Sequence, residues 1–323
     1  MKIKYLFLIF LLFNPNFIVN AQTSTKSEEV ADWYEWGELI GESDSTVTVI
    51  EMLSSDYGWA GGYGGLLAFW NGVTWASVSS PVTTRIFDIA IISESDAWAI
   101  TADSILQWNG VYWNIHTSFP EVDFLTSISM VSSTEGWIVG INYGFDGYIV
   151  DAPFIHWDGN AWTKYSYSLD IALNSVKMLS ADSGWAVGRG GSIVYYDGIK
   201  WTKIISPVTS TLYTVDFLSF NNGWAGGEGV ILRWNGASWV VYGYYSSLII
   251  KDMDITGVQE AWALDSDMIL KWSGDKWVVD YSTDLNLQSL SMVDSDYGWS
   301  VAGTKLINYR LPIHNIFLPF LTK

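Results

Sequence analysis

A unit marked by tryptophan recurs along most of the chain, and this repetition limits the fold more than any other feature of the sequence. Successive copies start 37 to 39 residues apart, except for one interval of 48 residues between the third and the fourth. The leading tryptophans of the seven copies are Trp59, Trp98, Trp137, Trp185, Trp224, Trp262 and Trp299. Because a repeat of this size buries its apolar face only by stacking on its neighbours, the repetition predicts one array of similar units.

A second element follows the leading tryptophan in six copies and brings two more aromatic residues together. It consists of an aromatic residue, then Asn, Asp or Ser, then Gly, with a further Trp three residues after the Gly. The six elements occupy residues 70–75, 108–113, 157–162, 196–201, 234–239 and 272–277. Asn-Gly and Asp-Gly favour tight hairpins. If residues 71 and 72 form a two-residue turn, Trp70 pairs with Val73 and Trp75 becomes its diagonal neighbour, whereas a three-residue loop reverses that arrangement.

The copy at residues 174–204 illustrates the structure expected of each unit. Segments rich in β-branched and aromatic residues alternate with small polar residues and Gly, which favour turns, and helical periodicity is missing. The expected strands are Ser175–Leu179, Trp185–Gly188, Ser192–Tyr196 and Lys200–Ile204. Each unit is therefore predicted to be a four-stranded antiparallel meander.

The two ends of the array decide between an open solenoid and a closed ring. Trp33–Trp36 precedes the first copy and has the character of a fourth strand with no sheet before it. The last copy has a third strand at Lys305–Arg310 but no turn and Trp after it. A solenoid would cap its ends with atypical repeats, whereas a ring pairs these two segments. We therefore expect an all-β fold: a single seven-bladed β-propeller over residues 32–310, with four-stranded antiparallel blades and the N-terminal strand completing the last blade.

The repeat resembles that of the photosystem II stability/assembly factor-like propellers, which are related to the sialidase-type Asp-box repeat proteins. The resemblance is carried by Gly-Trp-Ala-x-Gly followed by Ile-Leu-x-Trp-Asn-Gly-x-x-Trp, and the best matches are Asn221–Trp239 and Asp182–Trp201. The chain departs from the family in having Asn/Asp-Gly in place of Asp-Gly-Gly, and Trp where the family often has Thr. The resemblance implies an exported bacterial scaffold that is not catalytic and binds other proteins, but it does not carry over the link to photosynthesis.

Both ends of the chain lie outside the repeats. Two lysines, a short apolar run and a small-residue cleavage site at Ala21 give residues 1–21 the layout of a secretory signal peptide. The alternative is a membrane anchor, but the apolar run is too short to span a bilayer. We expect residues 22–31 to form a linker and the mature protein to be periplasmic, on the cell surface or extracellular. Residues 311–323 form a C-terminal tail that either serves sorting or surface retention, or packs on the outside of the propeller.

The charge of the chain limits its partners. Asp and Glu number 34 against 16 Lys and Arg, which gives a formal net charge of −18. Such a surface disfavours nucleic acid and anionic membranes, and no transmembrane segment is expected after signal cleavage. Cysteine is absent, so the exported protein depends on packing without disulfides. No Asn-x-Ser/Thr acceptor occurs, which favours a bacterial origin.

One face of the propeller is the expected place for a ligand or partner. The loops between the second and third strands share that face with the connections between blades, and variable loops commonly carry binding residues. The largest irregularity, an insertion at about residues 141–152 in the third copy, also lies there. The candidate binding residues are Tyr63, Tyr143, Phe145, Asp146, Tyr148, Asp151, Arg189, Glu228 and Asp265.

No catalytic or metal-binding constellation stands out in the sequence. The arginines and histidines are few and fall in unrelated positions, and no nucleophile elbow, phosphate loop or zinc spacing is present. We therefore expect no catalytic residue, metal or cofactor, and calcium binding has no specific motif behind it. The expected function is a non-catalytic scaffold that binds a protein through its loop rim. A lectin-like carbohydrate-binding propeller and a glycan-active hydrolase are the alternatives; exposed Trp between blades would favour the lectin, and buried Trp the scaffold.

Overall fold

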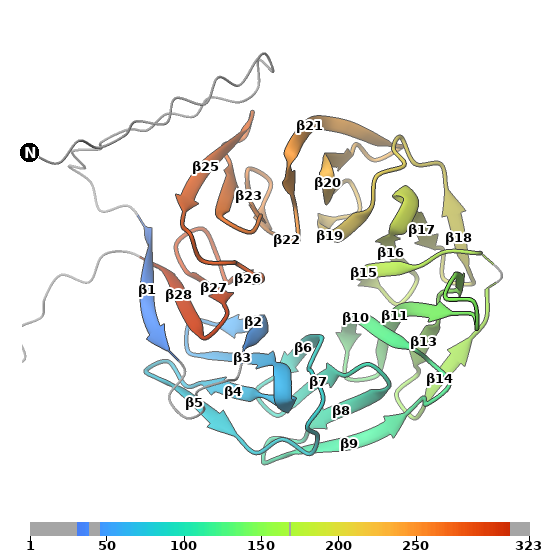
Figure 1. Ribbon diagram of the computed structural model, residues 1–323, viewed down its shortest axis with the longest axis horizontal. Coiled ribbons are helices and arrows are strands. Elements are labelled where there is room, and N and C mark those ends of the chain that lie inside the picture. Colours follow the sequence, from blue (N-terminus) through green and yellow to red (C-terminus); the bar gives the residue numbers. More distant parts are fainter. Residues whose placement is uncertain (1–30, 39–45, 168, 311–323) are drawn as a thin grey trace, which may run out of the picture.

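Seven antiparallel sheets are arranged radially around a central channel, like the blades of a propeller (Figure 1). The computed structural model describes residues 31–38, 46–167 and 169–310. The helical structure of this part consists of two short 3-10 turns, η1 (Tyr63–Gly65) and η2 (Arg189–Gly191), so it holds no helix long and apolar enough to cross a membrane. The seven-bladed all-β architecture expected from the repeat is confirmed.

The strands of each blade follow one another outward from the channel. Blade 1 consists of β2 (Val47–Ser54), β3 (Tyr57–Gly62), β4 (Leu67–Trp70) and β5 (Trp75–Val78). Blade 2 consists of β6 (Asp88–Ser93), β7 (Asp96–Ile100), β8 (Ser104–Trp108) and β9 (Trp113–Ser118). Blade 4 consists of β15 (Leu173–Ser180), β16 (Ser183–Gly188), β17 (Ile193–Tyr196) and β18 (Trp201–Ile204). Blade 6 consists of β22 (Asp252–Gly257), β23 (Glu260–Leu264), β24 (Met268–Trp272) and β25 (Trp277–Ser282).

Two blades depart from this plan. Blade 3 has a fifth strand: to β10 (Phe124–Ser132), β11 (Glu135–Tyr143), β13 (Phe154–Trp157) and β14 (Trp162–Tyr165) it adds β12 (Ile149–Asp151), which pairs with the extended end of β11. Blade 5 has three strands, β19 (Leu212–Ser219), β20 (Asn222–Trp234) and β21 (Trp239–Ile249). In the other blades a turn separates the second strand from the third. In blade 5 the corresponding turn, at Gly229, does not interrupt the strand, so β20 serves as both the second and the third strand.

The ring is closed by the two ends of the propeller, as the sequence predicted. Blade 7 consists of β26 (Ser289–Met292), β27 (Gly298–Ala302) and β28 (Lys305–Arg310), and β1 (Asp32–Glu38) pairs with β28 as its outermost strand. Trp33 lies opposite Tyr309, with 4.9 Å between the ring centroids, and its Nε1 donates to Asp280 of blade 6 at 2.9 Å. Trp33 thus occupies the place that the fourth-strand tryptophan fills in the other blades.

Indole rings hold neighbouring blades together. Each leading tryptophan is fully or almost fully buried. Six of the seven pack against the two aromatic residues of the hairpin in the next blade, whereas Trp262 packs against Tyr309 of blade 7. Trp224 of blade 5, for example, lies 5.0 Å from Trp272 and 5.2 Å from Trp277 of blade 6, measured between ring centroids. Tilted and edge-on pairs of this kind contribute about 0.5–1.5 kcal/mol beyond the burial of apolar area. The repeat tryptophans are therefore the walls between blades.

The hairpin after the third strand corrects one prediction. Trp70 pairs directly with Trp75 and not with Val73, so the loop spans four residues, and the two indoles face each other at 5.6 Å. The reason is the side chain of Asn71, whose Oδ1 accepts hydrogen bonds from the backbone N–H of Val73 (3.0 Å) and Thr74 (2.9 Å). Gly72 supplies the positive φ of 84° that this loop needs.

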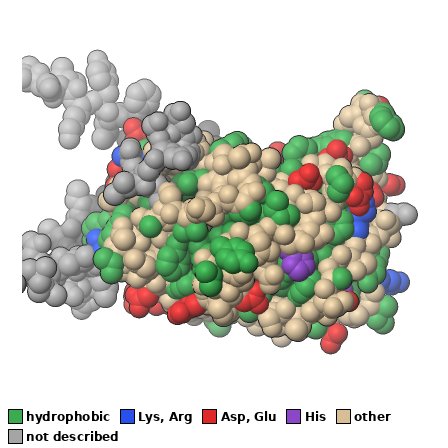
Figure 2. Space-filling view, turned by 90° about the horizontal axis from the view of Figure 1, so that it is seen from below, with side chains coloured by type: hydrophobic (Ala, Val, Ile, Leu, Met, Phe, Trp, Pro, Cys, Tyr) green, Lys and Arg blue, Asp and Glu red, His purple; other side chains and the backbone are tan. Residues whose placement is uncertain are grey.

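Two faces follow from the order of the strands. We call the lower face the one that carries the hairpins joining the first to the second strand and the third to the fourth. The upper face carries the connections from the second strand to the third and from one blade to the next. The chain enters the described part on the lower face at Asp32 and leaves it there at Arg310, because these two residues are paired. Figure 2 shows the disc from its side, with more acidic than basic side chains on the visible wall.

Candidate functional site

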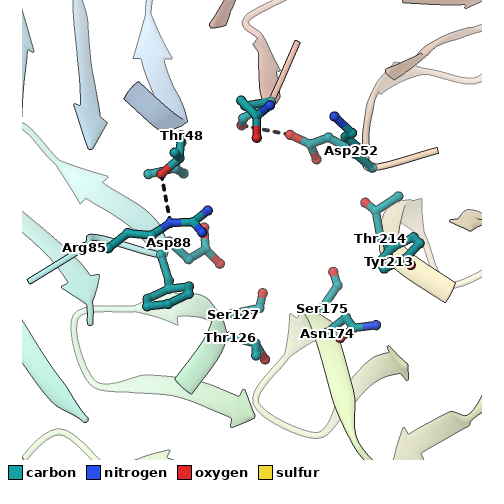
Figure 3. Close-up of a pocket in the computed structure, with 15 residues that line it drawn as sticks. Thr48, Arg85, Asp88, Thr126, Ser127, Asn174, Ser175, Tyr213, Thr214 and Asp252 are labelled. Carbon is teal, nitrogen blue, oxygen red and sulfur yellow. Dashed lines mark hydrogen bonds between the residues drawn. The ribbon is translucent and has the colours of Figure 1, made fainter. Parts of the chain in front are cut away.

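The innermost strands line the channel with successive layers of side chains. At the upper end, one residue from each blade forms what we call the mouth ring: Thr48, Phe87, Thr126, Asn174, Tyr213, Lys251 and Gln288. The next residue of each blade forms an upper layer of Val49, Asp88, Ser127, Ser175, Thr214, Asp252 and Ser289. Together with Arg85 these two layers enclose a cavity of about 210 Å³ that is mostly polar (Figure 3).

Arg85 projects over the mouth ring from the connection between blades 1 and 2. Its guanidinium lies over the rings of Phe87 and Tyr63, at 4.7 and 4.9 Å from the ring centroids. Its Nε donates to Thr48 Oγ1 at 3.3 Å, the contact drawn in Figure 3. Aromatic faces and a hydroxyl orient this cation but leave its charge without a counter-ion, since no carboxylate of the described residues lies within 4.0 Å.

Lys251 reaches the mouth from the connection between blades 5 and 6. Its Nζ donates to Asn286 Oδ1 and to the carbonyl oxygen of Leu287, both at 3.0 Å. Desolvation lowers the pKa of Lys251, while the charge of Asp265 acts in the opposite direction. Like Arg85, Lys251 forms no ion pair with a described carboxylate. A second cavity, of about 520 Å³, is lined by both cations together with Phe87, Thr126, Asn174, Tyr213 and Ile249.

The carboxylates of the upper layer are engaged in holding the blades together. Asp88 Oδ2 accepts the backbone N–H of Ile128 in blade 3 at 2.9 Å, and Asp252 Oδ2 accepts that of Leu290 in blade 7 at 3.0 Å. Ser289 also donates to Asp252 Oδ2 at 2.9 Å. Burial raises the pKa of Asp88 to about 6 and that of Asp252 to about 7, although these hydrogen bonds act in the opposite direction. These carboxyl groups are therefore structural bridges between blades.

A middle layer lies deeper in the channel, and each of its members pairs with the leading tryptophan of its own blade. It consists of Glu51, Ala90, Ser129, Lys177, Asp216, Asp254 and Ser291. Lys177 Nζ forms an ion pair with Asp216 Oδ1 at 2.6 Å, and this contact with Asp216 raises the pKa of Lys177. Asp254 accepts the backbone N–H of Met292 at 2.7 Å, while burial raises the pKa of Glu51.

The channel carboxylates do not assemble into a metal site. No group of three or more His, Cys, Asp or Glu in the described part of the chain has the geometry to hold a metal ion. Blades 3, 4 and 7 have no acid in either the upper or the middle layer, and serine hydroxyls make the same bridges there. In blade 3, Ser127 and Ser129 accept the backbone N–H of Val176 and Met178, at 3.2 and 3.0 Å. The exchange of Asp for Ser at equivalent positions indicates a common role in joining blades.

The residues proposed from the sequence lie on the upper face, and some of them are brought together. Arg189, in η2, lies 5.7 Å from the ring centroid of Tyr143, so the insertion of blade 3 meets blade 4. Glu228 accepts a hydrogen bond from the Tyr213 hydroxyl at 2.7 Å, which links it to the mouth ring. Tyr63, in η1, is joined to the mouth through Arg85.

The insertion itself forms a projecting hairpin between β11 and β12. Phe145 and Tyr148 at its tip are fully or largely exposed. Asp146 accepts the backbone N–H of Tyr148 at 3.2 Å, and Asp151 accepts from Asn142 Nδ2 at 2.8 Å, so both acids stabilise the hairpin. Asp265 is only 6% exposed and accepts the N–H of Ser266, so it faces inward and not onto the open rim.

The sequence reasoning missed the mouth ring and Arg85. Arg85 and Lys251 lie on connections between blades, outside the Trp-containing motif. Thr126, Asn174 and Tyr213 are three different polar residues, and together they match no known sequence motif. A signal was nevertheless present. Aligning the seven copies on the residue that pairs with the leading tryptophan places the mouth ring three positions earlier in every blade.

The histidines and the repeat tryptophans of the described part lie outside the channel mouth, and the burial of the tryptophans weakens the lectin alternative. His156 stacks on Trp137 at 4.4 Å and contacts Glu135 at 2.7 Å, and His116 packs edge-on against Trp98, so both histidines are on the outer strands, away from the channel. The repeat tryptophans are buried almost without exception. They therefore offer no flat indole face to a sugar between the described blades.

The fold and the channel mouth define the class: a seven-bladed β-propeller with a polar upper mouth. No known family profile matches the sequence, and no curated protein is similar to it. Solved structures share the fold. One of them is the photosystem II assembly factor YCF48, solved with a bound D1 peptide. It superposes with a TM-score of 0.68 at 14% identity, and the match covers 88% of this chain and 100% of that chain.

Other propellers are similar to a comparable degree. A streptogramin B lyase gives a TM-score of 0.73 at 12% identity, covering 87% of this chain and 98% of the other. The WD40 repeats of RRP9 give 0.68 at 12% identity, covering 88% and 99%. At these identities the likeness concerns the fold. It confirms the resemblance to photosystem II assembly factor-like propellers at that level.

Proposed function

We propose that this protein is an exported, non-catalytic scaffold that binds an extended peptide segment of a partner protein across its upper mouth. The partner presents a carboxylate, from an acidic side chain or a chain terminus, to Arg85 and Lys251. The observation that carries the proposal is that both cations line one cavity without a carboxylate counter-ion among the described residues, in a chain with a formal net charge of −18. Such cations attract an anionic group, because charge-assisted hydrogen bonds are the stronger ones.

The surroundings of the mouth suit a peptide. Amide and hydroxyl groups of Asn174, Thr126 and Tyr213 line the same cavity and are able to bond to a peptide backbone. The exposed aromatic tip of the insertion, with Phe145 and Tyr148, adds an apolar contact on the same face. Large exposed aromatic side chains are typical anchors of protein interfaces.

Two further considerations support the proposal. One propeller of similar fold was solved with a peptide bound, which makes peptide binding a role that this architecture supports. Another is named a lyase, but its likeness is limited to the fold, so activity does not transfer with it. Export rests on the signal-like residues 1–21, which lie outside the described residues.

The proposal is tested with peptides selected from a displayed random library on the mature protein. Binding of each selected peptide is measured by fluorescence anisotropy to wild type and to Arg85→Gln, Lys251→Gln and the double variant. We expect each single change to weaken binding about 10-fold, because a hydrogen bond to a charged group contributes about 1.5–3 kcal/mol.

Lys203→Gln serves as the matched control, because Lys203 is exposed on β18 at the outer wall of blade 4. It removes the same charge far from the mouth and should leave the affinity unchanged. Neutralising the carboxylates of the peptide as amides should weaken binding to wild type but not to the double variant. Equal binding by wild type and the double variant would contradict the proposal.

A further inference from the structure

Three aromatic rings form a continuous row on the upper face, with an arginine at each end. The guanidinium of Arg85 lies 4.7 Å from the ring centroid of Phe87. The Phe124 ring follows Phe87 at 6.2 Å, and the Tyr143 ring follows Phe124 at 6.3 Å, both measured between ring centroids. The guanidinium of Arg189 lies 5.7 Å from the centroid of the Tyr143 ring. We call Phe87, Phe124 and Tyr143 the aromatic row, which leads from the mouth ring to the insertion of blade 3.

The aromatic row is partly open to solvent and is not part of the repeated walls between blades. Phe124 is 41% exposed, and Phe87 and Tyr143 are half-buried. Phe124 stands two residues before the mouth-ring residue of its blade, as Arg85 does in blade 2. The other five blades have no aromatic residue at this position, where they carry Thr46, Ala172, Thr211, Ile249 and Asn286. The packing of the repeat therefore does not account for Phe124.

The cation at the far end of the row is also open to a partner. Arg189 is exposed and forms no ion pair with a carboxylate in the part of the chain that the structure describes. Asp123, beside the row, is engaged elsewhere, because its Oδ2 accepts the backbone N–H of Tyr143 at 2.6 Å. Desolvation raises the pKa of the Tyr213 hydroxyl, and the positive charge of Arg189 acts in the opposite direction. Arg189 therefore also lies near the mouth ring.

The dimensions of the row fit an extended peptide. Alternate side chains of a strand point to the same face and lie about 6.6 Å apart. The three rings follow one another at 6.2 and 6.3 Å, which is close to this spacing. An extended segment of roughly seven residues, at about 3.3 Å each, is long enough to reach from Arg85 to Arg189. The rings offer apolar contact area, and each guanidinium is able to bind a carboxylate through two parallel hydrogen bonds.

We propose that the aromatic row determines which peptide segments this protein binds. The segment places one carboxylate at Arg85, apolar side chains from alternate positions on the aromatic row, and a second carboxylate at Arg189. This inference rests on the proposed function, because it extends the contact at the mouth outward along the upper face. Charge complementarity argues for an acidic partner, since the two cations stand on a chain with a formal net charge of −18. A glycan stacked on the rings is the competing occupant.

The first test uses peptides selected from a displayed random library on the mature protein. We expect the selected sequences to share two acidic positions with apolar residues at alternate positions between them. Phe124→Ser should weaken their binding about 10-fold, because truncating an aromatic anchor commonly costs more than about 1 kcal/mol. Arg189→Gln should weaken it about 3- to 5-fold, as for an exposed ion pair. Selected sequences without a second acid would overturn the inference.

Control variants separate contact with the peptide from a change in the fold. Phe124→Leu and Arg189→Lys should retain most of the affinity, because they keep an apolar side chain and a charge. Tyr112→Ser is the matched control for Phe124→Ser, since Tyr112 is 58% exposed in the hairpin between β8 and β9 on the lower face. Lys203→Gln is the matched control for Arg189→Gln. Both controls should bind like wild type, and melting curves confirm that all variants are folded.

A double-mutant cycle assigns the second carboxylate to Arg189. Replacing the acid distal to the mouth by its amide should weaken binding to wild type about 3- to 5-fold and leave binding to Arg189→Gln unchanged. If the variants of Arg85 and Lys251 lose affinity while Phe124→Ser and Arg189→Gln bind like wild type, the proposed function stands and this inference fails. Binding of soluble oligosaccharides that is lost in Phe124→Ser would assign the row to a glycan and would also overturn it.

Discussion

The two ends of the channel are built on the same seven strands, yet they have opposite chemistry. The upper end exposes hydroxyls, amides and the two cations Arg85 and Lys251. The lower ends of the innermost strands instead carry partly exposed aliphatic side chains, those of Leu53, Val131 and Leu218. Between them, carboxylates and serines of the upper and middle layers bind the backbone of the next blade. The comparison teaches that the repeat fixes the walls between blades and leaves the residues at the two strand ends open to different uses.

The largest effect on stability is expected at the tryptophans between blades, because both ends of the channel depend on this packing. Trp224→Ala removes a buried indole that packs on Trp272 and Trp277 of the next blade. We expect a loss of about 3–5 kcal/mol in the free energy of unfolding, measured by denaturant titration. Trp36→Ala is the control, because Trp36 is 37% exposed and should cost clearly less. Equal losses would mean that burial between blades does not determine stability.

The next effect is a pH dependence of stability, and it arises from the buried carboxyl groups between the two ends of the channel. The folded-state pKa of Asp252 is raised to about 7 and that of Asp88 to about 6, above the value of 3.8 for a free carboxyl. Groups with raised folded pKa values add stability that is complete below about pH 4 and is lost as the pH rises through 6 and 7. The groups facing Asp252 are Ser289, the acids Asp254 and Glu51, and the backbone N–H of Leu290 and of Met253.

Asp252→Asn keeps an acceptor oxygen and removes this titration. We expect the variant to be more stable than wild type at pH 8, by on the order of 2 kcal/mol, and no more stable at pH 4. Thermal unfolding of both proteins from pH 4 to pH 8 measures the difference. A gap that does not grow with pH would show that Asp252 ionises freely in the channel.

A smaller loss is expected from the ion pair of the middle layer. Lys177→Met leaves Asp216 buried without its cation, and Glu51 and Asp254 add like charge nearby. Removing one partner of a buried pair is costly, but the Lys177 side chain is 40% exposed to the channel, which reduces the effect to roughly 1–2 kcal/mol. The loss is measured by urea titration. An unchanged free energy of unfolding would contradict this explanation.

The smallest effect on stability is expected at the tip of the insertion. Phe145→Ala should change the free energy of unfolding by less than about 0.5 kcal/mol, because the side chain is fully exposed. If the upper face binds the partner, the same change should weaken the affinity for the selected peptides. Val73→Ala is the matched control, since Val73 is exposed on the lower face. Equal effects of the two changes on peptide binding would argue against a role for the insertion.

The sequence was sufficient to predict the walls of this molecule. Regularly spaced tryptophans have few ways to be buried, so their number predicted the number of blades. The segments Trp33–Trp36 and Lys305–Arg310 each lacked a partner strand, so their pairing predicted the closure of the ring. The hairpin register failed at Asn71, where side-chain hydrogen bonds to Val73 and Thr74 stabilise a four-residue loop in preference to a two-residue turn.

The mouth was harder to predict because its chemistry is not repeated. No other blade repeats Arg85 or Lys251 at the equivalent position, and the connections that carry them differ in length between blades. Only the closed ring brings the two cations to one cavity. Asp265 illustrates the converse: its place in a rim loop was predictable, but its burial depends on how Ser266 and the neighbouring loops fold.

Hydrogen–deuterium exchange of the mature protein, with and without a selected peptide, compares the two ends most directly. The account predicts that the peptide slows exchange around Arg85–Asp88 and Ile249–Asp252 at the mouth and leaves the lower ends of the innermost strands, at Leu53, Val131 and Leu218, unchanged. Protection at those lower ends without protection at the mouth would contradict it, because the ligand would then enter from the apolar side.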